Sequence, residues 1–163
     1  MTGQAIARRP LVLLVDDNSA DVRLVHELAS EAGRLPVLDI AADGVEALAR
    51  VRCEGPFAGH PPVDLILLDL NLPRCDGIEV LAELKHDEAF RHIPVIVLTT
   101  SSSPTDVNAA YAAGAAAFVT KPADIDGLAD LLCAIDQFWL QQVTFRRPTP
   151  PPPFNPADIK RPR

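Results

Sequence analysis

Five short aliphatic runs alternate with five longer amphipathic segments, and this alternation restricts the fold more than any other feature of the chain. The runs at 11–15, 65–68 and 95–98 consist wholly of Val, Leu and Ile, and weaker runs lie at 37–41 and 117–120. Continuous aliphatic runs of this length are typical of strands that are buried on both faces of a parallel sheet. We therefore predict five strands at these ranges.

Each strand is followed by a segment that carries apolar residues at helical spacing. Gly33 and Gly114 follow two of these segments and favour helix ends. Strands that alternate with helices in this way indicate an open, doubly wound α/β sheet of (βα)5 form. The predicted helices are residues 20–32, 44–53, 77–85, 105–113 and 124–143.

Length and charge limit what else the chain can be. Its 163 residues fit one domain at 10–145 between an N-terminal tail at 1–9 and a Pro-rich, basic tail at 146–163. This leaves no room for a DNA-binding output domain, and a net charge of -7 argues against a nucleic-acid partner. Unpaired cysteine spacing, the absence of an apolar signal segment and the absence of a bilayer-length apolar run predict a cytoplasmic protein with no membrane partner.

Polar residues follow four of the predicted strands at the points where the strands end. They are Asp16 and Asp17, Asp69, Thr99 and Lys121. In a sheet of this kind these strand ends lie along one edge, where ligands bind. Converging carboxylates repel one another unless a cation compensates, and Mg2+ prefers oxygen ligands. Together with an ammonium group, such a site suits phosphoryl transfer to a carboxylate nucleophile.

Each of these residues alone has a commoner explanation. An Asp after a strand often caps the next helix, a lone Lys is usually a solvated surface residue, and Thr is an ordinary strand residue. Their joint placement at the ends of the first, third, fourth and fifth strands favours a common site.

Four segments, LVDDN, LILLDLNLPRCDG, IPVIVLTT and AGAAAFVTKP, resemble the receiver domains of two-component response regulators. The resemblance covers about residues 10–140. It implies a flavodoxin-like receiver fold with strand order 2-1-3-4-5. It also implies a signalling protein without other enzymatic activity, which accepts a phosphoryl group from a partner histidine kinase in a Mg2+-dependent reaction.

The resemblance assigns roles at the acidic edge of the sheet. Asp69 is the expected phospho-acceptor. Asp17 is an expected direct Mg2+ ligand, Asp16 is expected to hold metal-bound water, and the backbone carbonyl of Asn71 is the third expected protein ligand.

The same resemblance assigns a phosphoryl-binding and switching role to later residues. Thr99 is expected to hydrogen-bond the phosphoryl group and Lys121 to form a salt bridge with it. The Lys121–Pro122 peptide bond is expected to be cis. Phe118 is the expected switch aromatic, which turns inward when Thr99 moves toward the phosphoryl group, and plain core packing is the alternative for this residue.

Among receiver domains, the chain resembles most the response regulators of phytochrome-type histidine kinases. The points of likeness are PFAGHPPVDLILLDLNLPRCDG, HDEAFRHIPVIVLTTS, and QFWLQQV before the Pro-rich tail. That group forms dimers through an extended last helix and tail. The expected homodimer interface is Ile135, Phe138, Trp139, Leu140 and Val143, and the alternative is that these residues fold back onto their own sheet.

Other functions fit the sequence less well. A haloacid-dehalogenase-type phosphatase places its nucleophile after the first strand in a D-x-D pattern, whereas here Asp16 and Asp17 are adjacent. A flavodoxin needs a Ser/Thr/Gly-rich phosphate loop where this chain has acids. A phosphate sink and a receiver-like interaction module that is never phosphorylated remain as alternatives.

Overall fold

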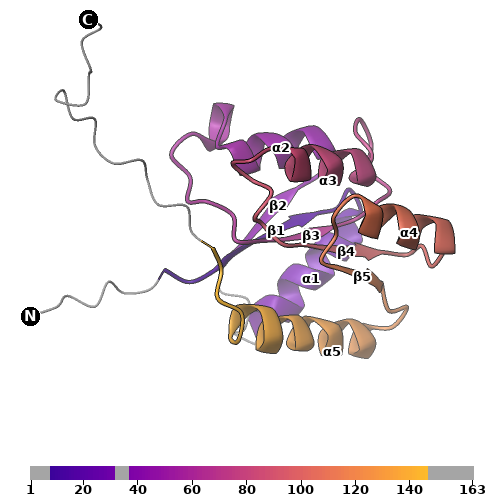
Figure 1. Cartoon of the computed structure of the whole chain (residues 1–163). Coiled ribbons are helices and arrows are strands. Elements are labelled where there is room, and N and C mark those ends of the chain that lie inside the picture. The colour runs from indigo at the N-terminus through magenta and orange to yellow at the C-terminus, as the bar shows by residue number, and fades with distance from the viewer. Residues whose placement is uncertain (1–7, 32–36, 147–163) are drawn as a thin grey trace, which may run out of the picture.

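Five parallel strands form the sheet in the computed structural model, which describes residues 8–31 and 37–146 (Figure 1). Their order is β2-β1-β3-β4-β5, which confirms the predicted topology. Four of the predicted strands have the bounds expected, and the fourth continues by one residue to Thr99. The strands are β1 (Leu11–Val15), β2 (Val37–Ala41), β3 (Leu65–Leu68), β4 (Val95–Thr99) and β5 (Ala117–Thr120).

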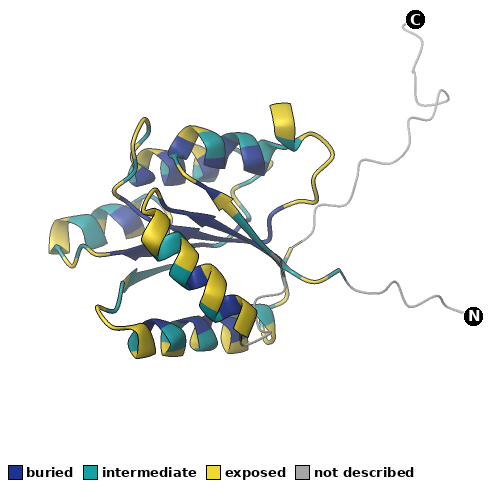
Figure 2. Ribbon diagram, turned by 180° about the vertical axis from the view of Figure 1, so that it is seen from behind, coloured by how far each residue is buried: buried dark blue, intermediate teal, exposed yellow. Residues whose placement is uncertain are grey.

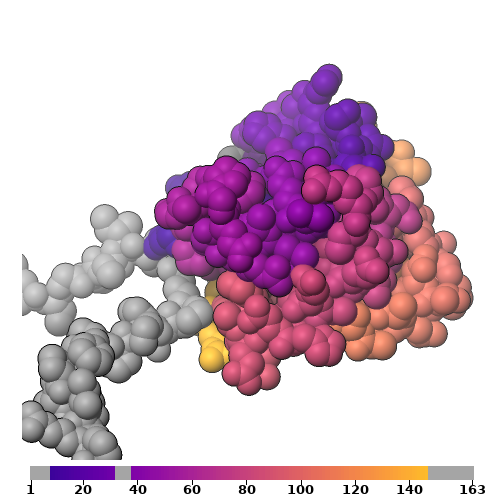
Figure 3. All heavy atoms as spheres, turned by 90° about the horizontal axis from the view of Figure 1, so that it is seen from above, coloured from indigo at the N-terminus to yellow at the C-terminus, as the bar shows by residue number. Residues whose placement is uncertain are grey.

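Helices cover both faces of the sheet. Packing contacts join α2 to α3 and α3 to α4 on one face, and α1 to α5 on the other (Figure 1). Seen from above, the purple atoms of α2 and the magenta atoms of α3 lie side by side on this face of the molecule (Figure 3). The helices are α1 (Ser19–Glu31), α2 (Gly44–Arg52), α3 (Gly77–His86), α4 (Pro104–Ala112) and α5 (Ile125–Ile135), with a short 3-10 helix η1 (Gly55–Phe57). None of the helices in the described ranges is long and apolar enough to cross a membrane.

The period-2 geometry of the strands divides the core into two parts. Along β1, Leu11, Leu13 and Val15 pack toward α2 and α3, whereas Val12 and Leu14 pack toward α1 and α5. Every residue of β1, β3 and β4 is buried (Figure 2). This explains why these strands are aliphatic without polar alternation, since both of their faces lie under helices.

The last helix differs from the prediction of one continuous helix over 124–143. α5 ends at Ile135 and continues as a π-helical turn, η2 (Asp136–Leu140). The wider turn is closed by the backbone N–H of Val143, which donates to the carbonyl of Phe138 at 3.1 Å.

Most of the predicted interface faces the protein's own core. Ile135 is buried in the cluster under α1 and α5, and Trp139 and Leu140 pack against it. Ile135, a predicted residue of the homodimer interface, is therefore not available to a partner in this structure, because its helical position faces the sheet. Phe138 is 58% exposed, and Val143 is half-buried.

The predicted tails fall largely outside the described residues. Of the N-terminal tail only Arg8 and Arg9 are described, and of the Pro-rich tail only Arg146. Arg8 pairs with Asp64 at 2.9 Å, and the same carboxylate accepts the backbone N–H of Leu11 at 2.7 Å. These two contacts connect the start of β1 to the residue that precedes β3. The predicted end of the first helix, at Ala32 and Gly33, also lies outside the described residues.

Candidate functional site

The predicted strand-end residues occupy one edge of the sheet. Asp16 and Asp17 follow β1, Asp69 follows β3, Thr99 ends β4 and Lys121 follows β5. Carboxylate oxygens of Asp16, Asp17 and Asp69 lie within 4.8 Å of one another, although these aspartates are up to 53 positions apart. The parallel order of β1 and β3, which are directly paired, brings them together.

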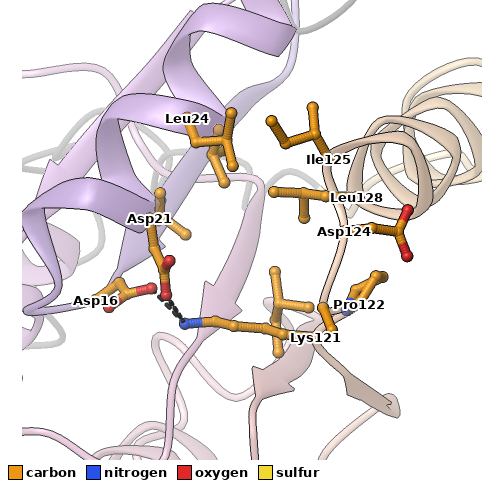
Figure 4. Close-up of a pocket in the computed structure, with 12 residues that line it drawn as sticks. Asp16, Asp21, Leu24, Lys121, Pro122, Asp124, Ile125 and Leu128 are labelled. Atoms are coloured by element: carbon orange, nitrogen blue, oxygen red, sulfur yellow. Dashed lines mark hydrogen bonds and ion pairs between the residues drawn. The ribbon is translucent and has the colours of Figure 1, made fainter.

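The ammonium group of Lys121 is hydrogen-bonded to three carboxylates. Its Nζ lies 2.6 Å from Asp16 Oδ2, 3.0 Å from Asp21 Oδ2 and 3.1 Å from Asp69 Oδ2. Figure 4 shows the Lys121 side chain extending from the end of β5 toward Asp16 and Asp21. Because an ammonium group has three N–H bonds, each carboxylate can take one.

Burial and charge act against each other on the pKa values of this group. Burial alone would lower the pKa of Lys121, but the hydrogen bonds and charges of Asp16, Asp21 and Asp69 outweigh it and raise that pKa above its ordinary value. Burial raises the pKa of Asp16, although Lys121 and the backbone N–H of Asn18 partly offset the effect. The site therefore holds more negative charge than its one ammonium group can compensate.

The loop after Asp69 is shaped by a close backbone approach at Gly77. A Cβ atom on Gly77 would meet the carbonyl oxygen of Asp69 and would lie 2.6 Å from the Cα of Leu70. The N–H of Gly77 also donates to the carbonyl of Leu70 at 3.1 Å. Asp76 caps α3 in a capping box with Glu79. The start of α3 therefore fixes the backbone that carries Asp69.

Asn71 lies in this loop, two residues after Asp69. Its backbone N–H donates to Asp69 Oδ1 at 3.2 Å, so both carboxylate oxygens of Asp69 are oriented, one by Asn71 and the other by Lys121. The predicted role of the Asn71 carbonyl as a metal ligand stays a prediction.

Thr99 is fully buried at the end of β4. Its Oγ1 accepts the N–H of Ser101 at 3.5 Å, and the Ser101 hydroxyl donates to the carboxylate of Asp106 in α4. The hydroxyl of Thr120 donates to the Ser101 carbonyl at 3.3 Å. These contacts connect the segment after Thr99 to α4 and β5.

Phe118, the predicted switch aromatic, lies on β5 opposite Val97 of β4. Its side chain is half-buried and packs against the core on the α2–α3–α4 face. Its backbone N–H donates to the hydroxyl oxygen of Tyr111 in α4 at 3.2 Å. These contacts agree with core packing in this state of the protein, and the switch role stays a prediction.

The Lys121–Pro122 peptide bond was expected to be cis, but it is trans, as is every peptide bond in the described ranges. That prediction was wrong for this structure. The trans form is the lower-energy isomer of an X–Pro bond by about 0.5–1 kcal/mol. With the bond trans, Lys121 reaches its three carboxylates, and its backbone N–H donates to the Thr99 carbonyl at 2.7 Å.

The sequence interpretation missed Asp21, the third carboxylate on Lys121. This residue lies in the first turn of α1, where an acidic residue is ordinarily explained by the helix dipole. The available signal was its position, four residues after Asp17 and in the first turn of the helix that starts beside the acidic pair. That position places it near the same edge of the sheet.

A cavity of about 110 Å³ lies beside the Asp21–Lys121 pair. Leu24 of α1 and Ile125 and Leu128 of α5 form part of its apolar wall, and Pro122 lies at its side (Figure 4). The ion pair thus connects α1 to the segment between β5 and α5 at the polar end of this cavity.

The arrangement fits a divalent cation. Three converging carboxylates offer hard oxygen atoms, and one of them, Asp17, is exposed to solvent so that bound water can remain on an ion. The nucleophile candidate, Asp69, belongs to this cluster and also accepts a hydrogen bond from Lys121 at 3.1 Å. Such an edge, on an open parallel sheet, defines a class of protein that takes a phosphoryl group onto an aspartate.

Comparison with known proteins leads to the same class. The profile of the response regulator receiver domain matches residues 12–132. Response regulator Rcp1 of Synechocystis is 42% identical over 134 residues, which are 82% of this chain and 91% of Rcp1. The chain therefore belongs to the response regulator receiver family, whose general function is to be phosphorylated by a kinase.

Two solved structures are particularly similar. The phosphorylated cyanobacterial phytochrome response regulator RcpA is 39% identical with a TM-score of 0.81, over 86% of this chain and 100% of RcpA. The Mn2+-bound form of Rcp1 is 40% identical with a TM-score of 0.78, over 85% of this chain and 99% of that chain. The chain is thus homologous to phytochrome response regulators.

Proposed function

We propose that this chain accepts a phosphoryl group on Asp69 from a phytochrome-type histidine kinase, with Mg2+ held by Asp16, Asp17 and Asp69 and by the Asn71 carbonyl. The observation that carries the proposal is the position of Asp69, whose two oxygens contact Lys121 Nζ and the Asn71 N–H beside two further carboxylates. A receiver-like module that is never phosphorylated has no need for this costly concentration of charge.

The chemistry is one displacement at phosphorus. The phosphorus–nitrogen bond of a phosphohistidine breaks, its electron pair stays on the imidazole, and a new phosphorus–oxygen bond forms to an Asp69 oxygen. Lys121 supplies a positive charge where negative charge accumulates on the transferring oxygens. Buried Thr99 offers a hydroxyl at the end of the neighbouring strand. Bound Mg2+ would supply further compensation of this charge.

The first test is intact mass spectrometry after incubation with acetyl phosphate, with and without Mg2+. We expect wild type to gain one phosphoryl group in a Mg2+-dependent reaction and Asp69→Asn to gain none, because an amide oxygen is a poor nucleophile. Asp130→Asn, the same change at an exposed carboxylate on α5, serves as the matched control and should still be phosphorylated. A phosphoryl group on the Asp69→Asn protein would contradict the site assignment.

The kinase class is proposed from homology to the phytochrome response regulators RcpA and Rcp1. We expect faster phosphotransfer from an autophosphorylated phytochrome-type kinase than from an unrelated histidine kinase, measured by loss of label from each kinase. Equal rates would contradict the phytochrome assignment while leaving the receiver chemistry intact.

Homodimer formation through the end of α5 is part of the same proposal. The support is an exposed aromatic side chain, Phe138, which lies edge-to-face against Trp139 with ring centroids 5.6 Å apart. The two rings line a shallow apolar groove with Ala117 and Val119 of the edge strand β5. Exposed apolar surface of this kind marks interaction sites.

A further inference from the structure

All three N–H bonds of the Lys121 ammonium group face carboxylates in this structure. A phosphoryl group on Asp69 would bring further anionic oxygens to the same ammonium group. Those oxygens must therefore share Lys121 with its present partners or displace one of them. The three partners differ in ways that decide which one gives way.

Asp21 is the partner with the lowest cost of release. Its side chain is 35% exposed, whereas the Asp16 side chain is 2% and the Asp69 side chain 9% exposed. A carboxylate that is already in contact with water can be rehydrated when its cation leaves, whereas a buried carboxylate left alone is costly. Asp16 Oδ2 also lies closer to Lys121 Nζ, at 2.6 Å, than Asp21 Oδ2 does, at 3.0 Å.

Asp21 also differs from its neighbours in its relation to the metal cluster. The converging carboxylates are Asp16, Asp17 and Asp69, and Asp21 is not one of them. A cation bound there would attract Asp16 and Asp69, whereas Asp21 has only Lys121 as its charged partner among the contacts described. Its charge therefore acts on the phosphoryl site through Lys121 and through space.

We infer that Asp21 competes with the phosphoryl group for Lys121. Resting on the proposed phosphorylation of Asp69, this inference makes Asp21 a positioning residue that sets how much of the Lys121 charge reaches the phosphoryl oxygens. Both effects of the Asp21 carboxylate have the same sign. It occupies an N–H bond of Lys121, and its negative charge repels an incoming anion.

A purely structural role predicts a different outcome. An acidic residue in the first turn of a helix stabilises that helix through its dipole. On that basis, neutralising Asp21 would lower the melting temperature and leave the affinity for a phosphoryl analogue unchanged. A role in holding Lys121 over the site predicts weaker binding after truncation to Ala. The competitor role, in which Asp21 occupies Lys121 and repels the incoming anion, predicts tighter binding.

The test is calorimetric titration of the full chain with beryllofluoride, a phosphoryl analogue, in the presence of Mg2+. We expect Asp21→Asn and Asp21→Ala to bind about three- to tenfold more tightly than wild type, the upper value being ~1.4 kcal/mol. Asp21→Glu should restore wild-type affinity. Glu27→Gln removes one charge from an exposed position on the same helix and should have no effect.

Unchanged or weaker binding by both Asp21→Asn and Asp21→Ala would overturn the inference. Failure of wild type to bind beryllofluoride would count against the proposed function itself. A metal-free experiment separates failure of the inference from failure of the proposed function, since it measures the Asp21–Lys121 interaction without the analogue. In a double-mutant cycle of unfolding with Lys121→Met, we expect a favourable Asp21–Lys121 coupling, and the absence of coupling would also overturn the inference.

Discussion

At the scale of single residues, the site depends on a close backbone approach as much as on its charged groups. Gly77 begins α3 against the carbonyl of Asp69, with no space for a side chain. Gly44 begins α2 with similarly close neighbours, since a Cβ there would lie 2.6 Å from Val80 Cγ2 and 2.8 Å from the carbonyl oxygen of Cys75. Only the Gly77 contact involves the residue proposed to receive the phosphoryl group.

Gly77→Ala should therefore impair both stability and phosphorylation. We expect the free energy of unfolding to fall by about 1–3 kcal/mol, as for overpacking in a dense core, and phosphoryl uptake from acetyl phosphate to slow because Asp69 is displaced. Urea unfolding and mass spectrometry measure the two effects. Gly44→Ala is the matched control, which should lose similar stability but keep uptake near that of wild type. Equal uptake in the two variants would refute the claim about Gly77.

The sequence predicted some residues of the site but not others. Asp16, Asp69 and Lys121 could be placed together because each directly follows a strand of a parallel sheet, so topology alone fixes the edge on which they lie. Asp21 could not be paired with Lys121 in this way, because its side-chain direction depends on how α1 packs against the sheet. The conformation of the Lys121–Pro122 bond was equally beyond the residue pattern.

At the scale of elements, a buried arginine joins β2, α2 and the segment before β3. The Arg50 side chain is 1% exposed, and its Nε donates to Asp39 Oδ2 at 2.6 Å. Its Nη2 donates to the Pro61 carbonyl at 2.9 Å, and its Nη1 has no hydrogen-bond partner within residues 8–31 and 37–146. The charge of Arg50 is thus compensated by one carboxylate, which is itself 33% exposed.

This imbalance predicts unequal effects of removing either partner. Asp39→Asn leaves the guanidinium buried without a counter-charge and should lower the free energy of unfolding by about 2–3 kcal/mol, somewhat less than for a fully buried pair. Arg50→Met leaves only the partly exposed Asp39 carboxylate, which water can solvate. This variant should change the free energy of unfolding by less than about 1 kcal/mol. Urea unfolding of both variants measures the difference. A larger loss of stability in Arg50→Met than in Asp39→Asn would contradict this prediction.

The sequence predicted the boundary of an element correctly where the residues on both sides of that boundary differ clearly in polarity. β1 and β3 are closed by Asp residues after pure aliphatic runs, and their predicted bounds are confirmed. The end of α5 carried no such signal, because the apolar spacing continues through Phe138 and Trp139. The π-helical turn there results from packing against the sheet, which the local pattern does not encode.

At the scale of the whole molecule, the C-terminal segment reaches the opposite end of the sheet from the acidic site. Burial lowers the pKa of His92, which precedes β4, and the positive charges of Arg146 and Lys85 lower it further. Lys85 itself donates to the carbonyl of Ile93 at 2.6 Å. The end of the described chain is therefore electrostatically coupled to the segment between α3 and β4.

This coupling gives a pH dependence with a definite sign. The folded chain binds the His92 proton less readily than the unfolded chain, so acidification below the ordinary pKa of 6.5 favours unfolding. Between about pH 7.5 and pH 5.5, wild type should lose more stability than His92→Gln, as measured by urea unfolding. Arg146→Gln should raise the His92 pKa in an NMR titration. No change in that pKa would disprove the coupling.

The proposed dimer belongs to the same scale. Phe138 is the exposed aromatic residue at the end of the last helix, and Ile125 at the start of α5 is equally exposed at 58%. Phe138→Ser should shift sedimentation velocity toward the monomer because it removes an apolar anchor, whereas Ile125→Ser should leave the association unchanged. Identical sedimentation of wild type and the Phe138 variant would exclude this surface as the interface.

The π-helical turn η2 makes the segment after α5 respond differently to an insertion and to a deletion. A π turn contains one residue more than an α turn, and each α-helical residue rotates the following side chains by about 100°. Deleting one residue within 136–140 would allow this segment to close as an ordinary α turn, so the residues after it would keep the faces that they now present. Inserting one residue before Phe138 would instead rotate Phe138 and Trp139 by about 100°. A single-codon insertion would therefore change which aromatic residue this surface presents to a partner, without any change in the acidic edge of the sheet.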